Sequence, residues 1–397
     1  MNRIYADNAA TTKPSRRATQ VMLEVMEQNY ANPSSLHTPG QLAAVALAES
    51  RSKIASILNC EPRDIIFTSG GSEADNQAIL TGAVLGERKG KKHIVSTKFE
   101  HHAVLHTLQK LEKQGFEVTY LDVHSNGMVH LDELEAALRP DTALVTIMYA
   151  NNEIGSIQPI RAIGEICRKH GVLFHTDAVQ AVGHLPIDVQ ADNIDMLSLS
   201  GHKFHGPKGV GALYIRKGVA PAVLIEGGAQ ERGKRAGTEN LPAIAGMAAA
   251  LEEAVEKMDE HTAHLRAMRD RLIEGITKIP HSTLTGDPVN RLPGCASFCF
   301  EGIEGEALLL LLDQKGVCGS SGSACTSGSL DPSHVLLAIG LPHEVAHGSL
   351  RLSLSHENTM EEMDAIVEAV TEVVGYLRSI SPVWDDLQKG NKDYVIQ

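Results

Sequence analysis

The sequence lacks the features that mark membrane, secreted and nucleic-acid-binding proteins. Aliphatic runs such as Ala307 to Leu312 are far too short to cross a bilayer, and the first residues, MNRIYADNAATT, hold no apolar segment of signal-peptide length. Lys and Arg total 36 against 49 Asp and Glu, and a net charge of -13 repels a phosphate backbone. We therefore expect a cytoplasmic protein that spans no membrane and binds no nucleic acid.

Paired cysteines are also missing. None of the six follows a CxxC spacing: Cys60, Cys167, Cys295, Cys299, Cys318 and Cys325. Neither a zinc site nor a disulfide framework is indicated, and no other metal site is predicted. Reduced thiols are the default, and most of them should behave as small buried apolar residues.

The length and composition that are present indicate an ordinary globular protein of two domains. Single domains stop growing at roughly 250 to 300 residues, and this chain has 397. With 43% hydrophobic and 21% charged residues, the composition is neither disordered nor fibrous. Two domains that share one crevice are therefore expected.

Short β-rich runs alternate with helix-like stretches from about residue 64 to residue 215. The runs are DIIFTSG, KHIVSTK, EVTYLDV, TALVTIMYA, VLFHTDA, DMLSLSG and GALYIRK. This alternation predicts an α/β fold with a mostly parallel sheet of seven strands covered by helices. Such sheets bind ligands in the crevice outside the C-terminal ends of their strands, so the reactive residues should follow the strands.

The pattern changes near residue 260. A predicted helix from about 242 to 268 is followed by another helix, the strand CASFCFE, the helix EGEALLLLLDQ and a Gly/Ser stretch. We predict a large domain over 16–259 and a smaller α+β domain over 260–397, with residues 1–15 packing on the smaller one. The last expected helix spans about 360 to 377, and a polar tail with the only Trp follows it.

Lys203 is the first candidate for chemistry. It lies in SLSGHKFHGPKGVG (198–211), directly after a strand, among Ser, Gly, His and Pro. A lysine at a strand end can point into the crevice, where its amine could form a Schiff base with the aldehyde of pyridoxal 5'-phosphate (PLP) and later act as a base. Lys208 is the local competitor, and a solvated turn lysine is the alternative.

Asp177 is the candidate partner for the pyridine nitrogen of that cofactor. A carboxylate there keeps the nitrogen protonated, and the pyridinium then accepts electrons from the substrate. VLFHTDAVQ places Asp177 at a strand end, and Gln180 could lie beside the ring. The alternative is an Asp that caps the next helix.

A phosphate site is predicted in FTSGGSEADN. Gly70, Gly71 and Ser72 stand between a strand and a helix expected to begin near Glu73. The N–H groups and the dipole at a helix N-terminus attract an anion. An ordinary capped turn would look the same, so the order of strand, turn and helix carries this prediction.

Two further segments follow strands. KFEHHAVL brings His101 and His102, of which we favour His101 for stacking on the pyridine and for proton transfer. Partly exposed histidines at a helix start are the alternative. In ANNEIGSIQP, Asn152 could hydrogen-bond the cofactor or the substrate.

Two residues late in the chain point to the substrate. Cys325 lies in SSGSACTSGSLDPSHVL (320–336). The Gly/Ser content predicts a mobile loop over about 320–333 that could carry a nucleophilic cysteine. The alternative is an incidental cysteine in a loop. Arg351 stands in GSLRLSLS among small and apolar residues, an uncommon setting unless the arginine binds a carboxylate. An α-amino or α-keto acid substrate is indicated.

Together these motifs resemble the class V, fold-type I PLP enzymes, and among them the cysteine desulfurases of the NifS and IscS kind. YADNAATT, NPSSLH, GGSEADN, EHHAVL, NNEIG, HTDAVQ, SGHKFHGPKG, RAGTEN, SSGSACTSGSLDPSHVL and SLRLSLS occur in the family's order along nearly the whole chain. The resemblance implies a PLP-dependent transferase-like fold and a homodimer.

The resemblance also implies roles for single residues. Lys203 would hold the cofactor, Asp177 and Gln180 would bind its ring, and His101 would stack on it. Phosphate ligands would include Ser72, Ser200 and His202, with Thr238 of RAGTEN reaching the phosphate of the other subunit. The substrate carboxylate would meet Asn32, Asn152 and Arg351, and Cys325 would carry the persulfide.

The activity implied is the conversion of L-cysteine to L-alanine, with sulfur passed from Cys325 to an iron-sulfur scaffold protein. The DPSHVL continuation resembles the nitrogenase-type enzymes more than the housekeeping type, while the acceptor and the pathway stay open. Rival readings are a selenocysteine or sulfinate lyase and a catalytically silent binding protein.

Overall fold

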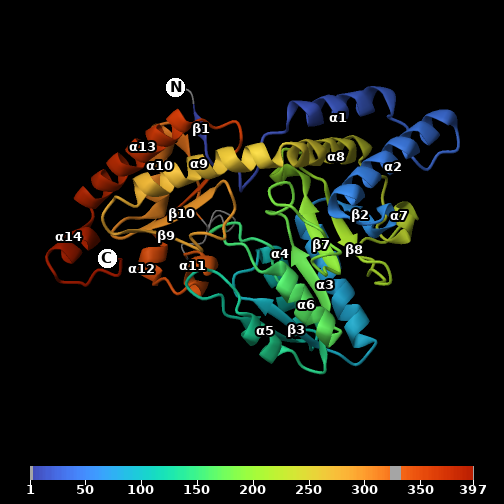
Figure 1. Ribbon diagram of the computed structural model, residues 1–397, viewed down its shortest axis with the longest axis horizontal. Helices are drawn as coiled ribbons and strands as arrows, with labels where there is room; N and C mark the ends of the chain where they lie inside the picture. The colour runs from blue at the N-terminus through green and yellow to red at the C-terminus, as the bar shows by residue number, and fades with distance from the viewer. Residues whose placement is uncertain (1–2, 322–331, 397) are drawn as a thin grey trace.

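The computed structural model describes residues 3–321 and 332–396 (Figure 1). Its largest element is a sheet of seven strands in the order β2-β8-β7-β6-β5-β3-β4. All neighbouring pairs are parallel except those of β8, which runs antiparallel to both β2 and β7. The mostly parallel seven-stranded sheet predicted from the sequence is therefore confirmed.

Each of the seven apolar runs forms one strand. Their bounds are β2 (Ile65–Thr68), β3 (His93–Thr97), β4 (Glu117–Leu121), β5 (Thr142–Thr146), β6 (Leu173–Asp177), β7 (Met196–Ser200) and β8 (Gly211–Ile215). Alternate residues point to opposite faces, so Ile65 and Phe67 enter one apolar core and Ile66 enters another. The central strands are buried throughout because helices cover both faces.

Helices α3 (Gly71–Glu87) and α4 (His102–Glu112) cover one face of the sheet, and α2 (Thr38–Leu58), α6 (Ile160–His170) and α8 (Leu241–Glu256) cover the other. Helix α1 (Arg16–Gln28) lies along α8 (Figure 1). The shorter helices in this part are α5 (Leu131–Ala137), α7 (Gln230–Gly233), and the 3₁₀ turns η1 (Pro62–Asp64) and η2 (Gly201–Lys203).

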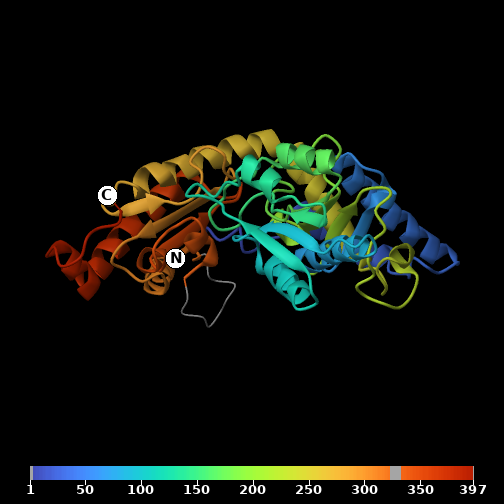
Figure 2. The ribbon, with the colours of Figure 1, turned by 90° about the horizontal axis from the view of Figure 1, so that it is seen from below.

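A second unit surrounds the antiparallel sheet β12-β10-β9, with bounds β9 (Ser282–Leu284), β10 (Cys295–Phe300) and β12 (Ser349–Ser353). Together with this sheet, a separate apolar core is enclosed by the helices α9 (Met258–Ile276), α10 (Gly305–Gln314) and α13 (Met360–Ser379). The second unit lies beside the large sheet (Figure 2). Strand β1 (Ile4–Tyr5) pairs in parallel with β11 (Val317–Cys318), which joins the start of the chain to this unit. The domain limits at residues 15 and 259 stay a prediction.

The prediction of a single helix over 242–268 is wrong, because two helices occupy this span. Lys257, with φ -108° and ψ 11°, separates α8 from α9. Helix α8 buries residues such as Leu251 in the core of the large sheet, whereas α9 buries Met268 and Leu272 in the second core. The break lets each helix turn its apolar face to a different core.

The polar tail expected after residue 377 is also structured. Helix α14 (Pro382–Gln388) follows α13, and the Arg378 guanidinium lies 4.0 Å from the Trp384 ring centre. The carboxylate of Glu301 accepts the N–H groups of Val395 and Ile396. The Glu301 contacts join residues more than 90 positions apart in sequence, so local composition did not indicate them. The remaining short helices are α11 (His334–Ala338) and α12 (His343–Ala346).

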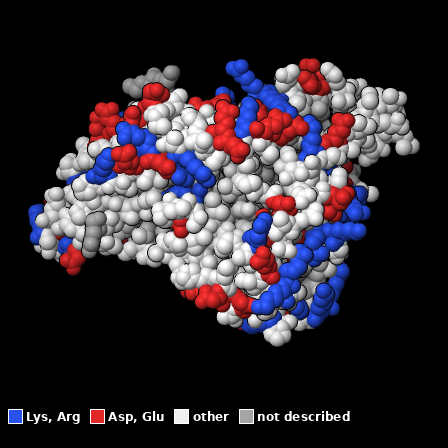
Figure 3. Space-filling view, viewed as in Figure 1, with Lys and Arg blue, Asp and Glu red and all other residues white. Residues whose placement is uncertain are grey.

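Within the described ranges, no helix is both long and apolar enough to span a bilayer. Charged side chains are sparse over the outer ends of α1 and α2 (Figure 3). Exposed hydrophobic side chains are found in and between these helices: Leu23, Met26, Tyr30, Leu36, Leu42 and Val45. Tyr30 and Leu36 are 76% and 91% exposed, so this surface is apolar and without cover in the single chain.

Candidate active site

Most of the residues singled out in the sequence line one cavity of about 290 Å³. They are Gly71, Ser72, His101, Asn152, Asp177, Gln180, Ser200, His202, Lys203 and Arg351. The segments that carry them follow or end strands β2, β3, β5, β6 and β7, with β12 adding the arginine. The cavity lies at the edge of the sheet where the parallel strands end, as expected for this fold, and its size suits a small cofactor.

Lys203 ends the turn η2 directly after β7. Its Nζ donates to the carbonyl oxygens of Ala9 and Ala10, at 2.5 and 2.9 Å, so the N-terminal segment covers the amine. The carbonyl of Lys203 contacts His184 Nε2 at 2.9 Å, which fixes the backbone from behind. Lys208 is exposed and does not line the cavity. The geometry favours Lys203 over its local competitor.

Asp177 is the last residue of β6 and is 5% exposed. Its Oδ1 accepts the N–H of Val179 at 2.9 Å. Burial raises the pKa of Asp177, while the nearby His101 and Lys203 lower it. Gln180 Nε2 donates to the Ala9 carbonyl at 2.9 Å, which draws the amide side chain to the same wall.

The anion end of the cavity is formed where α3 begins. This helix starts at Gly71, two residues earlier than expected, so its first N–H groups face the cavity. A Cβ on Gly71 would lie 2.6 Å from Val179 Cγ2, so a larger residue would not fit without moving the segment after β6. Ser72, Ser200 and His202 add side-chain donors at this end.

His202 reaches the N-terminal segment as well, with Nδ1 3.1 Å from Thr11 Oγ1. Burial, followed by the charges of Lys203 and Lys208, lowers the pKa of His202 to about 4. The imidazole is therefore neutral at pH 7, and it can donate one hydrogen bond and accept another.

His101 and His102 have different surroundings. His101 lines the cavity and caps α4, with Nδ1 accepting the N–H of Ala103 at 3.1 Å, so a neutral ring carries its proton on Nε2. Burial lowers the pKa of His101. The ring of His102 instead lies 5.0 Å from that of His106 and 4.7 Å from that of His334. The structure thus places the favoured histidine at the cavity.

Arg351 brings the second unit to the cavity. Buried on β12, it donates to the Asn152 carbonyl at 3.0 Å and to Asp7 Oδ1 at 3.0 Å. Its Nε has no hydrogen-bond partner among the described residues. A buried guanidinium with a spare donor at a cavity wall is suited to bind a carboxylate.

Two predicted residues are not in this cavity wall. Asn32 and Thr238 are exposed elsewhere, and the Oδ1 of Asn32 accepts the N–H of Ser34 at 2.9 Å. Cys325 lies outside the described residues. Their roles stay predictions, and Thr238 is predicted to act on the other subunit.

The cavity also contains residues that the sequence analysis did not select. They are Ala9, Ala10, Asp75, Met148, Ala150 and Val179. Asp75 follows Gly71 by four residues on α3, so the two share one helix face. That spacing is a signal in the sequence by which Asp75 could have been found.

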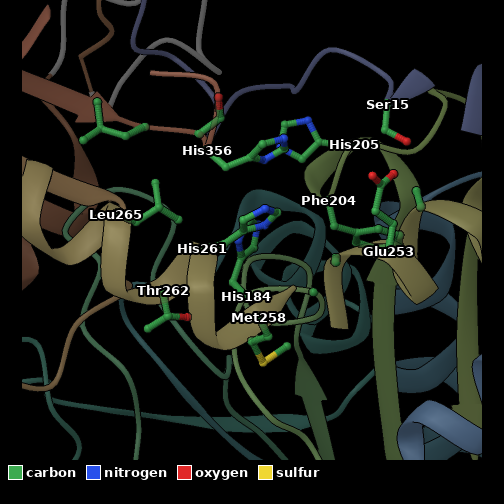
Figure 4. Close-up of a pocket in the computed structure, with 15 residues that line it drawn as sticks. Ser15, His184, Phe204, His205, Glu253, Met258, His261, Thr262, Leu265 and His356 are labelled. Atoms are coloured by element: carbon green, nitrogen blue, oxygen red, sulfur yellow. The ribbon is translucent and has the colours of Figure 1, made fainter. Parts of the chain in front are cut away.

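A smaller hollow of about 40 Å³ is lined by residues of both units, including Phe204 and Leu265 (Figure 4). Four histidines line it: His184, His205, His261 and His356. The rings of His261 and His356 stack in parallel with centres 4.2 Å apart. The volume holds at most a few water molecules, so this hollow cannot hold a cofactor.

One group of possible metal ligands is found among the described residues: His124, His130 and Glu133. The two imidazoles stack face to face, with ring centres 3.5 Å apart and an interplanar angle of 12°. Their in-plane lone pairs therefore lie in two almost parallel planes, which is an unfavourable geometry for binding one ion. Glu133 instead lies at hydrogen-bond distance from His124 Nε2, at 3.1 Å.

Comparison with known proteins gives the family. The model described as Aminotransferase class-V matches residues 4–366. The chain belongs to this family. It is 55% identical, over 96% of this chain and 94% of the relative, to a protein of Methanosarcina thermophila named cysteine desulfurase IscS. It is 48% identical to a cysteine desulfurase of Nostoc sp., over 97% and 96% of the two chains.

Solved structures of class-V relatives give the same fold. A NifS-like protein superposes with a TM-score of 0.89 at 40% identity, over 94% of this chain and 100% of that one. Another from Rickettsia africae gives 0.85 at 31% identity, over 94% and 100%. The resemblance drawn from the sequence motifs and the predicted fold class are both confirmed.

Proposed function

We propose that this class-V family member is a PLP-dependent cysteine desulfurase that converts L-cysteine to L-alanine and leaves the sulfur as a persulfide on Cys325. The observation that carries the proposal is the meeting of Lys203 and Asp177 in one cavity with an anion-binding helix N-terminus. Relatives that are 55% and 51% identical to almost the whole chain are named cysteine desulfurase IscS.

The cavity fits PLP in chemistry as well as in size. Lys203 supplies the amine for covalent attachment, Asp177 a carboxyl for the pyridine nitrogen, and the start of α3 with Ser200 and His202 donors for the phosphate. Buried polar atoms without partners, such as Arg351 Nε, are what a missing ligand leaves behind. When bound, the cofactor withdraws electrons from the α-carbon of an amino acid.

The protein's own residues then bind the substrate and move protons. Arg351 and Asn152 hold the carboxylate, with Asn32 as a further predicted contact. Lys203, once displaced by the substrate amine, takes the α-proton because its Nζ lies in the same cavity. Neutral His101 is the candidate acceptor for the proton of the substrate thiol, since it lines the cavity with a lowered pKa.

Four of the other five cysteines are poor candidates for the nucleophile, and the fifth, Cys318, serves as the control variant below. Burial raises the pKa of Cys60 and of Cys299 to about 12, and it also raises the pKa of Cys167 and Cys295. A thiol that stays protonated is not nucleophilic at neutral pH. Cys325, in its Gly/Ser-rich sequence, is therefore the proposed sulfur acceptor.

We further propose a homodimer that acts in the cytoplasm and passes sulfur to an iron-sulfur scaffold protein, with nitrogenase maturation as one candidate pathway. The apolar surface of α1 and α2, including Tyr30 and Leu36, supports association, because large exposed apolar surfaces mark interfaces. Thr238, exposed in the single chain, is the residue proposed to reach the phosphate of the other subunit.

The decisive experiment compares the purified wild type with Cys325→Ala and Cys318→Ala after loading with PLP. Wild type should form alanine and sulfide from L-cysteine and a thiol, and mass spectrometry should find added sulfur on Cys325. Cys325→Ala should keep the cofactor's visible absorption and change it on adding cysteine, but should form almost no alanine.

Cys318→Ala is the matched control and should be nearly as active as the wild type. Full alanine production by Cys325→Ala would exclude the persulfide and favour a lyase that releases sulfur without an enzyme thiol. A wild type that binds no PLP would favour the silent binding protein.

A further inference from the structure

Two carboxyl groups, those of Asp75 and Asp177, lie in the wall of the cavity that the described residues form. The proposed function uses only Asp177. Asp75 is 1% exposed, and its Oδ1 has no hydrogen-bond partner in the described structure. A buried carboxyl without a function or a full set of partners calls for an explanation.

The groups behind Asp75 form a neutral chain. His175 Nε2 lies 3.7 Å from Asp75 Oδ1 and 3.0 Å from Ser198 Oγ. On its other side, His175 Nδ1 contacts Thr146 Oγ1 at 2.8 Å. Burial lowers the pKa of His175 to about 3, so this ring brings no positive charge to Asp75 at neutral pH.

The two carboxyls face different charges. Lys203 is a cation near Asp177 and favours its ionised form, and the imidazole of His101 acts in the same direction when it is protonated. Burial and repulsion by the acids Asp177 and Glu100 raise the pKa of Asp75, and no cation among the described residues offsets them. Two carboxylates in one dry wall cannot both be charged at low cost, and the proton therefore resides on the one without a cation.

We propose that Asp75 is a positioning residue that stays protonated and holds Asp177 as the ionised partner of the cofactor's pyridine nitrogen. A neutral acid in this position adds no second negative charge, and its O–H is a hydrogen-bond donor that leucine and alanine lack. It leaves the anion on Asp177, where the pyridinium needs it. This inference rests on the proposed function and adds a role to a residue outside the attachment and phosphate sites.

The test uses asparagine, which mimics the neutral acid but cannot ionise. Wild type, Asp75→Asn, Asp75→Leu and Asp177→Asn are loaded with PLP labelled with ¹⁵N at the pyridine nitrogen. The ¹⁵N chemical shift reports protonation of that nitrogen, and equilibrium dialysis gives the cofactor's dissociation constant. Thr176→Val is the matched control, because the Thr176 hydroxyl is likewise buried without a partner and lies next to Asp177.

We expect Asp75→Asn and Thr176→Val to keep a protonated pyridine nitrogen and a dissociation constant within about threefold of wild type. Asp75→Leu should shift the ¹⁵N signal toward unprotonated pyridine and weaken binding by roughly tenfold, and Asp177→Asn should do so more strongly. Thermal unfolding midpoints establish that each variant is folded, and Asp75→Ala replaces Asp75→Leu if the latter is not.

The opposite results would overturn the inference. If Asp75→Asn lost the pyridine proton as Asp177→Asn does, Asp75 would be a second anion. If Asp75→Leu, or Asp75→Ala in its place, had the ¹⁵N shift and the dissociation constant of wild type, Asp75 would only fill space. If the wild type did not bind PLP, the proposed function itself would be overturned. The two results above concern only the role of Asp75, because they presuppose that the wild type binds PLP.

Discussion

The guanidinium of Arg351 forms an ion pair with the carboxylate of Asp7, with Nη2 and Oδ1 3.0 Å apart. This pair joins β12 to the N-terminal segment beside the proposed substrate site. The same guanidinium donates to the Asn152 carbonyl, and its side chain is buried. Charge-assisted hydrogen bonds to two different segments fix the arginine in one orientation before substrate arrives.

Arg351→Lys should raise the KM for cysteine by roughly tenfold or more, because a lysine keeps the charge but loses the planar set of donors. The cofactor's absorption should not change. Asp7→Asn, which removes the ion pair and keeps the arginine, should raise KM less. Steady-state kinetics of the three proteins provide the measurement, and an unchanged KM in Arg351→Lys would show that the arginine only braces the two segments.

Lys203→Ala should abolish turnover, because no other amine lines the cavity within the described residues and can both attach the cofactor and move the α-proton. Lys208 should not compensate, since it is exposed outside the cavity. Borohydride reduction of the wild type followed by peptide mapping should label Lys203. A label on Lys208 would refute the assignment.

Asp177→Asn should leave the fold intact but reduce turnover far more than tenfold, because the pyridine nitrogen loses the carboxylate that keeps it protonated. Asp177→Ala should behave alike. Single-turnover rates of α-proton exchange in deuterated water measure the effect. Activity within about tenfold of wild type, or about 1.4 kcal/mol of barrier, would show that Asp177 acts only as a cap for the segment after β6.

The buried Glu153 predicts a pH dependence of stability. Its carboxyl accepts the Ser333 hydroxyl, and burial raises its pKa to about 7. In the unfolded chain the pKa is about 4.3, so between roughly pH 4 and 7 the native state keeps a proton that the unfolded state has lost. Stability from this group is therefore complete below the unfolded pKa and falls as pH rises to about 7, by on the order of 3 kcal/mol.

Glu153→Gln removes this titration while its amide oxygen can still accept from Ser333. The thermal unfolding midpoints at pH 5 and pH 8 should differ less in the variant than in wild type. The stability of the variant relative to wild type should be greater at pH 8 than at pH 5. If the unfolding midpoints of both proteins changed equally between pH 5 and pH 8, Glu153 would be ionised in the native state at both pH values.

The sequence alone determined the strands of the large sheet and the identity of most candidate site residues. Seven apolar runs gave seven strands, because a β-rich run between turns specifies a buried strand locally. Residues such as Asp177 and Lys203, which end or follow strands, could be placed at one edge of the sheet because parallel strands end together. Motif order supplied the family and the persulfide role of Cys325, whose Gly/Ser-rich context alone left open a loop nucleophile or an incidental cysteine.

Only the tertiary structure decided what those residues contact. The cover of Lys203 by Ala9, nearly 200 positions away in sequence, arises because β1 pairs with β11 and carries the N-terminal segment across the cavity. The separation of His101 from His102 likewise depends on how α4 meets the cavity. The break at Lys257 follows from two cores that compete for one helical segment. Local periodicity encodes elements, whereas these contacts depend on packing between distant segments, which local sequence patterns do not show.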